Sequence, residues 1–317
     1  MSVAFSVVIP TYQRPETLGR VLESLGRQSD APEFEVVVVD DGSRDRTAAV
    51  LRAAAPPYPF RFFRQENSGP AAARNRGVEE ARGRFILFLG DDTVPEPELL
   101  SVHARAHAEP RPHPAAVLGY TTWPYERRVT PFLDHINEDG LQFGYRLIQD
   151  TESVPFNFFY TSNISLPRAL LLSAGLFDTT FPHAAWEDIE VAYRMMKAGM
   201  RIVYRPRAVA RHYHEITFAS FRRRQEKAGE AAAIFYEKHP ELGPFLAVPQ
   251  ALEFREVGGV REWATRTWAG LCERWEVPGG RKALDLVLRR DYLRGLSREL
   301  RKRQAAPVEA RSFGTSG

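Results

Sequence analysis

The chain has 317 residues, which is enough for one large α/β domain or for a domain of about 200 to 250 residues with an extension. Its 43 basic and 40 acidic residues nearly cancel, so the pI near 9.0 reflects a small excess and argues against nucleic acid as a partner. A single cysteine, Cys272, excludes an internal disulfide and any multi-cysteine zinc site. We expect no signal peptide and no transmembrane helix, because the apolar runs are short, and this favours a cytoplasmic protein.

The first hundred residues alternate between apolar runs and helical periodicity. Strands are predicted at 5–10, 34–39, 60–63 and 85–89, and helices over 15–25, 47–54 and 71–82, with a further helix starting near Pro95 or Pro97. Strands that are apolar on both faces and alternate with helices indicate a mostly parallel sheet covered on both sides. Ligands bind beyond the carboxyl ends of such strands. We therefore expect residues 10–12, 40–43 and 90–92 to meet in one crevice.

The rest of the chain is predicted less uniformly. Residues 105–165 contain many prolines and aromatics, and we expect strands and long loops there along one wall of a cleft. A helix ending at Gly175, a second helix over 187–197 and short strands at 202–204 and 208–212 follow. Helices are predicted from about residue 216, and the last ten or so residues are expected to be disordered. The predicted organisation is a domain over 1–215, with halves of about 1–100 and 101–215, and a helical extension over 216–317.

Two predicted strand ends carry adjacent aspartates. Residues 40–43, DDGS, form either a solvated turn or a functional site, and a carboxylate there can accept a hydrogen bond from the imide of a pyrimidine. Residues 90–92, GDD, follow the fourth predicted strand. One aspartate would suffice to cap the next helix, whereas two neighbouring carboxylates repel each other unless a cation offsets them. The pair therefore favours a divalent metal ion that bridges phosphate oxygens.

Three further patterns each allow a structural and a functional interpretation. Residues 67–77, NSGPAAARNRG, are either a tight loop with an alanine-rich helix or a place where cations and amides meet a diphosphate or base. No Gly-x-Gly-x-x-Gly follows the first strand, so a dinucleotide fingerprint is absent. Glu187 and Asp188 open a helix, where they interact with its dipole or provide a base that removes a proton from a hydroxyl group. His212 and His214 are predicted to lie on the same face of a strand. They are either surface residues, or one of them is a metal ligand.

Taken in order, the motifs closely resemble the signature segments of the family 2 glycosyltransferases, which have the GT-A fold. The segments are VVIPTYQR, VVVVDDGSRD, NSGPAAARNRG, FLGDDTVPEPELL, TSNISLPR, GLFD and WEDIEVAYRMMKAG, within residues 5 to 215. The resemblance implies an α/β GT-A fold with a mostly parallel central sheet flanked by helices and a helical C-terminal extension. It also implies an enzyme that moves a sugar from a nucleotide-diphospho-sugar to an acceptor hydroxyl, with inversion and with Mn²⁺ or Mg²⁺, in glycan or polysaccharide biosynthesis.

The resemblance also implies roles for individual positions. Asp188 corresponds to the catalytic base, and Asp92 with His212 to the metal site. The residues expected around the nucleotide-sugar, with Asp41 at the base and Asp91 at the ribose, are Pro10, Thr11, Tyr12, Arg14, Asp41, Asn67, Gly69, Arg74 and Asp91. The residues expected near the acceptor are Glu187, Trp186 and Asn163. Many relatives have an acidic residue where this chain has Gly90, and this departure predicts weaker metal binding.

Other functions remain open from the sequence. A metal-dependent phosphoester hydrolase would need a denser cluster of His and Asp ligands, and a non-catalytic nucleotide-sugar or glycan-binding module would not need the pair Glu187 and Asp188. The acceptor could be a glycan, a lipid-linked molecule or a small molecule. In the extension, Trp263, Trp268, Trp275 and Leu271 either pack against the first domain, which we favour, or form an arginine-rich amphipathic surface. The second alternative would place the protein at the inner face of a membrane as a peripheral protein.

Overall fold

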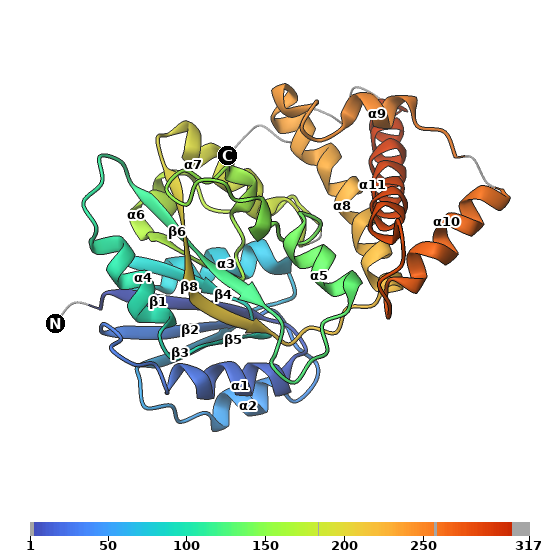
Figure 1. The fold of residues 1–317 in the computed structure, drawn as a ribbon. Helices are drawn as coiled ribbons and strands as arrows, with labels where there is room; N and C mark the ends of the chain where they lie inside the picture. Colours follow the sequence, from blue (N-terminus) through green and yellow to red (C-terminus); the bar gives the residue numbers. More distant parts are fainter. Residues whose placement is uncertain (1–2, 183, 257–258, 306–317) are drawn as a thin grey trace. The chain divides into compact units, whose positions relative to one another are not determined.

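The computed structural model describes residues 3–182, 184–256 and 259–305. The chain divides into two compact units, one made of Met1–Val129 and Asp134–Glu215 and the other of Thr130–Leu133 and Ile216–Gly317. The first unit contains an eight-stranded sheet, and the second contains helices α8 to α11 (Figure 1). The disorder predicted for the last residues concerns positions 306–317, which lie outside the described residues.

The sheet has the strand order β3-β2-β1-β4-β7-β6-β8-β5. Its strands are β1 (Phe5–Thr11), β2 (Phe34–Asp40), β3 (Phe60–Arg64), β4 (Phe85–Leu89), β5 (Thr93–Pro95), β6 (Ala115–Thr122), β7 (Asn163–Pro167) and β8 (Arg201–His212). The helices that precede residue 200 are α1 (Pro15–Leu25), α2 (Thr47–Ala53), α3 (Gly69–Glu80), α4 (Leu99–Ala108), α5 (Pro131–Glu138), α6 (Arg168–Ser173) and α7 (Glu187–Lys197). Short 3-10 helices lie at Tyr145–Leu147 and Phe156–Phe158.

The sheet is covered on both faces, which explains why its central strands are apolar throughout. In β1, Val7 and Ile9 pack in one core with residues of α1, while Val8 packs in a second core with Val78 of α3. Figure 1 shows α1 and α2 together on one face of the sheet. β1 pairs in parallel with β2 and β4, and β2 with β3, whereas β7 runs antiparallel to β4 and β6. The predicted mostly parallel α/β sheet is therefore confirmed.

Two predicted elements differ from the structure. The short strands predicted at 202–204 and 208–212 are one strand, β8, because β6 pairs with it on both sides of a register shift. Residues 206–208 fall opposite the step from Gly119 to Tyr120, so the strand accommodates Pro206 in a bulge. The helix predicted near Pro95 or Pro97 begins only at Leu99. Pro95 instead ends β5, which is the edge strand of the sheet, where a missing N–H is tolerated.

The second unit is built around two long helices. They are α8 (Phe218–Lys238) and α11 (Gly280–Ala305), and the shorter helices are α9 (Val248–Glu253), α10 (Val260–Leu271) and a 3-10 turn at Pro240–Leu242. The tryptophans at 263, 268 and 275 are exposed by 68%, 44% and 56%, so they are not part of the core of this unit, and their packing against the first domain stays a prediction. Within the part of the chain that is described, no helix is both long enough and apolar enough to cross a bilayer.

Helices α8 and α11 approach until their backbones touch, and this contact gives a stability prediction. A Cβ added at Gly295 would lie 2.0 Å from the carbonyl oxygen of Glu226, whereas a Cβ at Gly270 in α10 would meet nothing within 4 Å. Gly295→Ala should therefore lower the free energy of unfolding by about 1–3 kcal/mol, because the helices must separate. Gly270→Ala is the matched control and should be neutral or stabilising by up to about 1 kcal/mol, because alanine favours helix. Equal urea midpoints for the two variants would contradict the close packing.

Candidate active site

The carboxyl ends of β1, β2 and β4 meet, as the sequence predicts. At the end of β1, the Thr11 hydroxyl donates a hydrogen bond of 2.8 Å to Oδ2 of Asp91, which follows β4. The backbone N–H of Asp41, directly after β2, donates to the carbonyl oxygen of Thr11 at 2.9 Å. The end of β8 joins them, because the N–H of Tyr213 donates to the carbonyl oxygen of Asp92 at 2.7 Å. Segments far apart in the sequence thus place their polar residues at one edge of the sheet.

Asp91 and Asp92 lie beside a guanidinium group. Arg14 donates from Nη1 to Oδ2 of Asp92, its Nη2 lies 3.0 Å from Nδ1 of His214, and its Nε lies 3.8 Å from Oδ1 of Asp91. Burial and the charge of Asp92 raise the pKa of Asp91 well above its ordinary value. Burial also disfavours the charged form of Asp92, but His212, Arg14 and His214 together hold the pKa of Asp92 below its ordinary value. The repulsion between the two carboxylates is therefore relieved within the protein.

His212 lies beside the second oxygen of the Asp92 carboxylate, the one that Arg14 does not contact. Its Nε2 lies 3.5 Å from Oδ1 of Asp92, and Nδ1 of His214 lies 3.5 Å from Oδ2. Two residues that the sequence analysis did not single out hold the His212 ring. Nε2 of Gln142 lies 3.4 Å from Nδ1 of His212, and the Trp123 ring stacks on the imidazole at 6.0 Å between centroids. The aromatic content of residues 105–165 pointed to this wall, but nothing local to the sequence indicates which side chain reaches the histidine.

The residues present fit a divalent metal ion only in part. Among the described residues, no group of three or more His, Cys, Asp and Glu side chains is arranged to hold an ion. Asp92 Oδ1 and His212 Nε2 nevertheless offer an oxygen and a nitrogen donor side by side. Oε1 of Gln142 is buried without a hydrogen-bond partner, and a flip of this amide would let it accept from Nδ1–H of His212. That tautomer leaves the Nε2 lone pair of His212 available to a metal ion.

Gly90 lies close to the side chains of Thr93 and Asp92. A Cβ at this position would lie 2.6 Å from Oγ1 of Thr93 and 3.0 Å from Oδ1 of Asp92. A side chain here would first meet the Thr93 hydroxyl, which would have to shift. The glycine that distinguishes this chain from many relatives is thus closely packed in the turn after β4.

Asp41 supports the loop that leads into α3. Its Oδ1 accepts hydrogen bonds from the Ser68 N–H and from Nε2 of Gln65, and its Oδ2 accepts from the Gly69 N–H, at 2.8 to 2.9 Å. Nδ2 of Asn67 donates to the Asp41 carbonyl at 2.9 Å. Gly69 has φ +88°, a conformation that favours glycine. Because a carboxylate has about four acceptor positions, Oδ2 keeps one that could accept from a base.

Arg74 and Glu187 form a buried ion pair between α3 and α7. Nη1 of Arg74 donates to Oε1 of Glu187 at 2.8 Å, and the guanidinium lies 5.6 Å from the centre of the Phe177 ring. The side chains are only 11% and 3% exposed. Oε2 of Glu187 is buried and has no hydrogen-bond partner. The arginine expected at the nucleotide and the glutamate expected at the acceptor are therefore each other's partners.

Asp188 has the properties of a general base. Burial and the neighbouring charge of Glu187 raise the pKa of Asp188 to about 7, although Arg74 opposes the shift. A pKa close to neutral suits a group that must lose and accept a proton at physiological pH. Trp186, two residues before Asp188, is half-buried and has φ +73°, which is strained for a residue with a side chain. Such strain is typical of segments that hold a functional group in place.

Residues 6–164 match the model of Glycosyl transferase family 2. The chain belongs to this family. Validoxylamine A glucosyltransferase of Streptomyces hygroscopicus subsp. limoneus is 33% identical over 295 residues, which cover 82% of this chain and 64% of that protein. Hyaluronan synthase of Pasteurella multocida is 28% identical over 226 residues, which cover 62% of this chain and 23% of that protein. The chain therefore spans less than two thirds of the length of either relative.

Solved structures confirm the GT-A fold expected of a family 2 member. The mannosyltransferase PcManGT from Pyrobaculum calidifontis, in complex with GDP-Man and Mn²⁺, superimposes with a TM-score of 0.61 at 19% identity, over 95% of this chain and 88% of that one. S. aureus TarS 1-349 superimposes with a TM-score of 0.54 at 20% identity, over 96% of this chain and 93% of that one. At such identities the likeness concerns the fold alone.

One residue expected at the acceptor of this family 2 protein lies elsewhere. Asn163 is fully buried, its Oδ1 lies 3.0 Å from Nε2 of His103, and its Nδ2 donates to the Ala208 carbonyl at 2.8 Å. Its side chain holds β7 to neighbouring elements and cannot reach an acceptor, so this assignment is wrong. Pro10 is half-buried and Tyr12 is 43% exposed, both at the end of β1.

Proposed function

We propose that this chain transfers a glycosyl group from a nucleoside diphosphate sugar to a hydroxyl group of an acceptor, with inversion at the anomeric carbon. The observation that carries the proposal is Asp188, a half-buried carboxyl group whose pKa is raised to about 7 at the start of α7. Membership of glycosyl transferase family 2 supports it. PcManGT with GDP-Man and TarS with UDP-GlcNAc are solved complexes of proteins with the same fold.

The proposed reaction is a single displacement. Asp188 removes the proton of the acceptor hydroxyl while that oxygen forms a bond to the anomeric carbon. The bond from this carbon to the diphosphate breaks, and its electron pair leaves with the diphosphate oxygen. Because attack and departure occur on opposite faces of the sugar, the configuration inverts. Glu187 and Trp186, adjacent to the base, are the residues that we propose to border the acceptor.

The donor would lie along the ends of β1, β2 and β4. We assign the base to Asp41, whose Oδ2 keeps an acceptor position, and the ribose to Asp91. Asp92 and His212 would hold Mn²⁺ or Mg²⁺, which when bound stabilises negative charge on the leaving diphosphate. Arg14, already beside Asp92, is a second cation suited to phosphate oxygens. Pro10, Thr11, Tyr12, Asn67, Gly69 and Arg74 remain proposed neighbours of the donor.

A ligand screen followed by a turnover assay tests this function. Nucleoside diphosphates and their sugars, each with and without MnCl₂, should include at least one ligand that stabilises the chain by about 2.7 kcal/mol at 100 times its dissociation constant. The matching sugar donor should release nucleoside diphosphate faster when the correct acceptor is added. Release to water that no acceptor accelerates would favour the phosphoester hydrolase, and donor binding without turnover over a broad acceptor panel would favour a binding module. Either result would overturn the proposal.

A further inference from the structure

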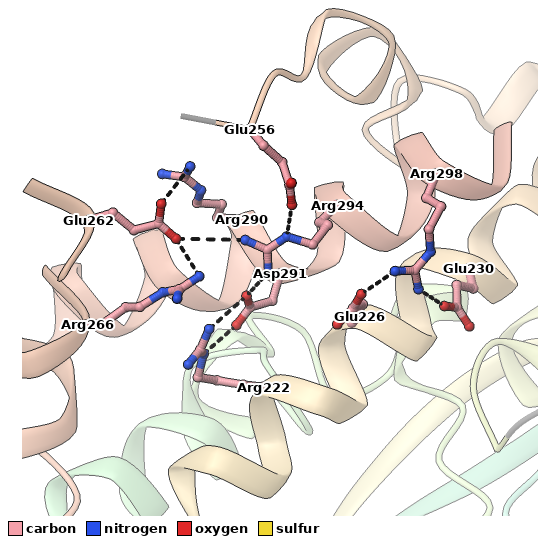
Figure 2. A network of polar contacts seen from close by, with 10 residues as sticks. All are labelled: Arg222, Glu226, Glu230, Glu256, Glu262, Arg266, Arg290, Asp291, Arg294 and Arg298. Carbon is pink, nitrogen blue, oxygen red and sulfur yellow. Dashed lines mark hydrogen bonds and ion pairs between the residues drawn. The ribbon is translucent and has the colours of Figure 1, made fainter. Parts of the chain in front are cut away.

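Helix α10 packs with its charged side inward. Glu262 forms an ion pair with Arg266, one turn later on the same helix. Its carboxylate also contacts two arginines of α11: Oε2 lies 3.0 Å from Nη2 of Arg290, and Oε1 lies 3.8 Å from Nη2 of Arg294 (Figure 2). The Glu262 side chain is only 14% exposed. A surface helix normally buries its apolar stripe and exposes its charges. In α10 the charges instead attach the helix to α11.

The opposite side of α10 is apolar and exposed. Val260 and Trp263 are 81% and 68% exposed, and at three residues apart they lie on the same side of the helix. Trp268 is 44% exposed, and its indole N–H donates to the Pro278 carbonyl at 3.0 Å. Large apolar side chains gathered on the outside of a well-anchored helix mark an interaction surface. We call Val260, Trp263 and Trp268, together with Leu286 of α11, the tryptophan face.

Helix α11 extends this surface and adds positive charge. Leu286 is 65% exposed and lies four residues before Arg290, so it is on the side of α11 next to α10. Lys282 and Arg289 are exposed neighbours of Leu286 on the helix. Neither forms an ion pair with any residue that the structure describes. Residues 260–290 carry seven basic and four acidic side chains.

We propose that the tryptophan face, with Lys282 and Arg289, binds the surface of an anionic lipid bilayer. Tryptophan suits the boundary between headgroups and acyl chains, because its ring is apolar and its N–H remains hydrated. Unpaired lysine and arginine side chains are attracted to anionic headgroups. A second copy of the chain fits less well, because a two-fold contact would bring the same unpaired cations together. The ion pairs between Glu262 and α11 hold α10 so that the tryptophan face points toward solvent. The helices would then lie on the bilayer surface without crossing it.

Vesicle co-sedimentation of the full chain tests the proposal. Binding to phosphatidylcholine vesicles that contain phosphatidylglycerol should exceed binding to pure phosphatidylcholine, and it should weaken as salt is raised. The double variant Val260→Gln, Trp263→Gln and the double variant Lys282→Glu, Arg289→Glu should each weaken binding by about tenfold or more. The double variant Arg223→Glu, Lys227→Glu is the matched charge control, because both residues are exposed on α8. Leu252→Gln is the matched apolar control, because Leu252 is 53% exposed on α9. Both controls should bind as the unmodified chain does.

Two further measurements separate the alternatives. Trp263→Tyr keeps an amphipathic ring and should retain most of the vesicle binding that Val260→Gln, Trp263→Gln loses. Sedimentation velocity should give the same oligomeric state for the chain and its variants. Equal binding to neutral and anionic vesicles, or variants that bind like the unmodified chain, would overturn the proposal. A change of oligomeric state in Val260→Gln, Trp263→Gln without loss of vesicle binding would assign the face to a contact between copies.

Discussion

Asp188→Asn should lower kcat by about 10²- to 10⁴-fold, because an amide cannot accept the proton of the acceptor hydroxyl. Asparagine has nearly the same shape, so the α7 start and the ion pair between Arg74 and Glu187 should remain intact. Donor binding should therefore be unchanged, as measured by thermal stabilisation with the nucleoside diphosphate. Asp150→Asn, at an exposed aspartate, is the matched control and should keep full activity.

The pH dependence provides a second readout of the same residue. Because burial and Glu187 raise the pKa of Asp188 to about 7, its carboxylate form is lost as the pH falls through neutrality. The value of kcat/KM should then decrease about tenfold per pH unit below 7 and level off above it. The residual activity of Asp188→Asn should lack this acidic limb. A variant with full transfer activity, or with an unchanged acidic limb, would remove the base assignment.

Asp92→Asn should lower kcat/KM by about 100-fold, because charge stabilisation at the leaving diphosphate is worth several kcal/mol. The substitution preserves shape but removes the charge that faces both Arg14 and His212. Mn²⁺ should no longer increase the thermal stabilisation given by the nucleoside diphosphate. Asp91→Asn is the internal comparison: at the ribose, it should weaken donor binding to the same extent with and without Mn²⁺.

Arg14 offers an explanation if the enzyme proves not to depend on a metal ion. Its guanidinium already neutralises part of the charge of the Asp91 and Asp92 pair. If kcat/KM survives exhaustive chelation, the arginine is the cation that supports the leaving group, and the metal role of Asp92 and His212 is wrong. If chelation abolishes activity and Mn²⁺ restores it, the arginine and the metal ion share the diphosphate.

Local chemistry predicted which residues gather at the ends of β1, β2 and β4. Buried valine-rich runs followed by DDGS and GDD identify where β2 and β4 end, and parallel strands bring their carboxyl ends to one edge. The bounds of α7, Glu187–Lys197, also agree with the prediction, because a charged helix start and an apolar stripe are both local signals. The contacts of Asn163 were not predictable in this way. Its burial depends on His103 and on β8, which are distant in the sequence.

The sequence by itself determined the family, the order of the strands and helices around the site, and the residues that end the central strands. Only the tertiary structure decided which side chains are partners: Arg74 with Glu187, His212 with Asp92, and Glu262 of α10 with the arginines of α11. Periodicity and turn chemistry act over a few neighbouring residues, whereas these pairs are 25 or more positions apart and form only when particular elements pack together. A helical period also identifies the apolar stripe of α10, but the ion pairs of Glu262 determine that this stripe faces outward.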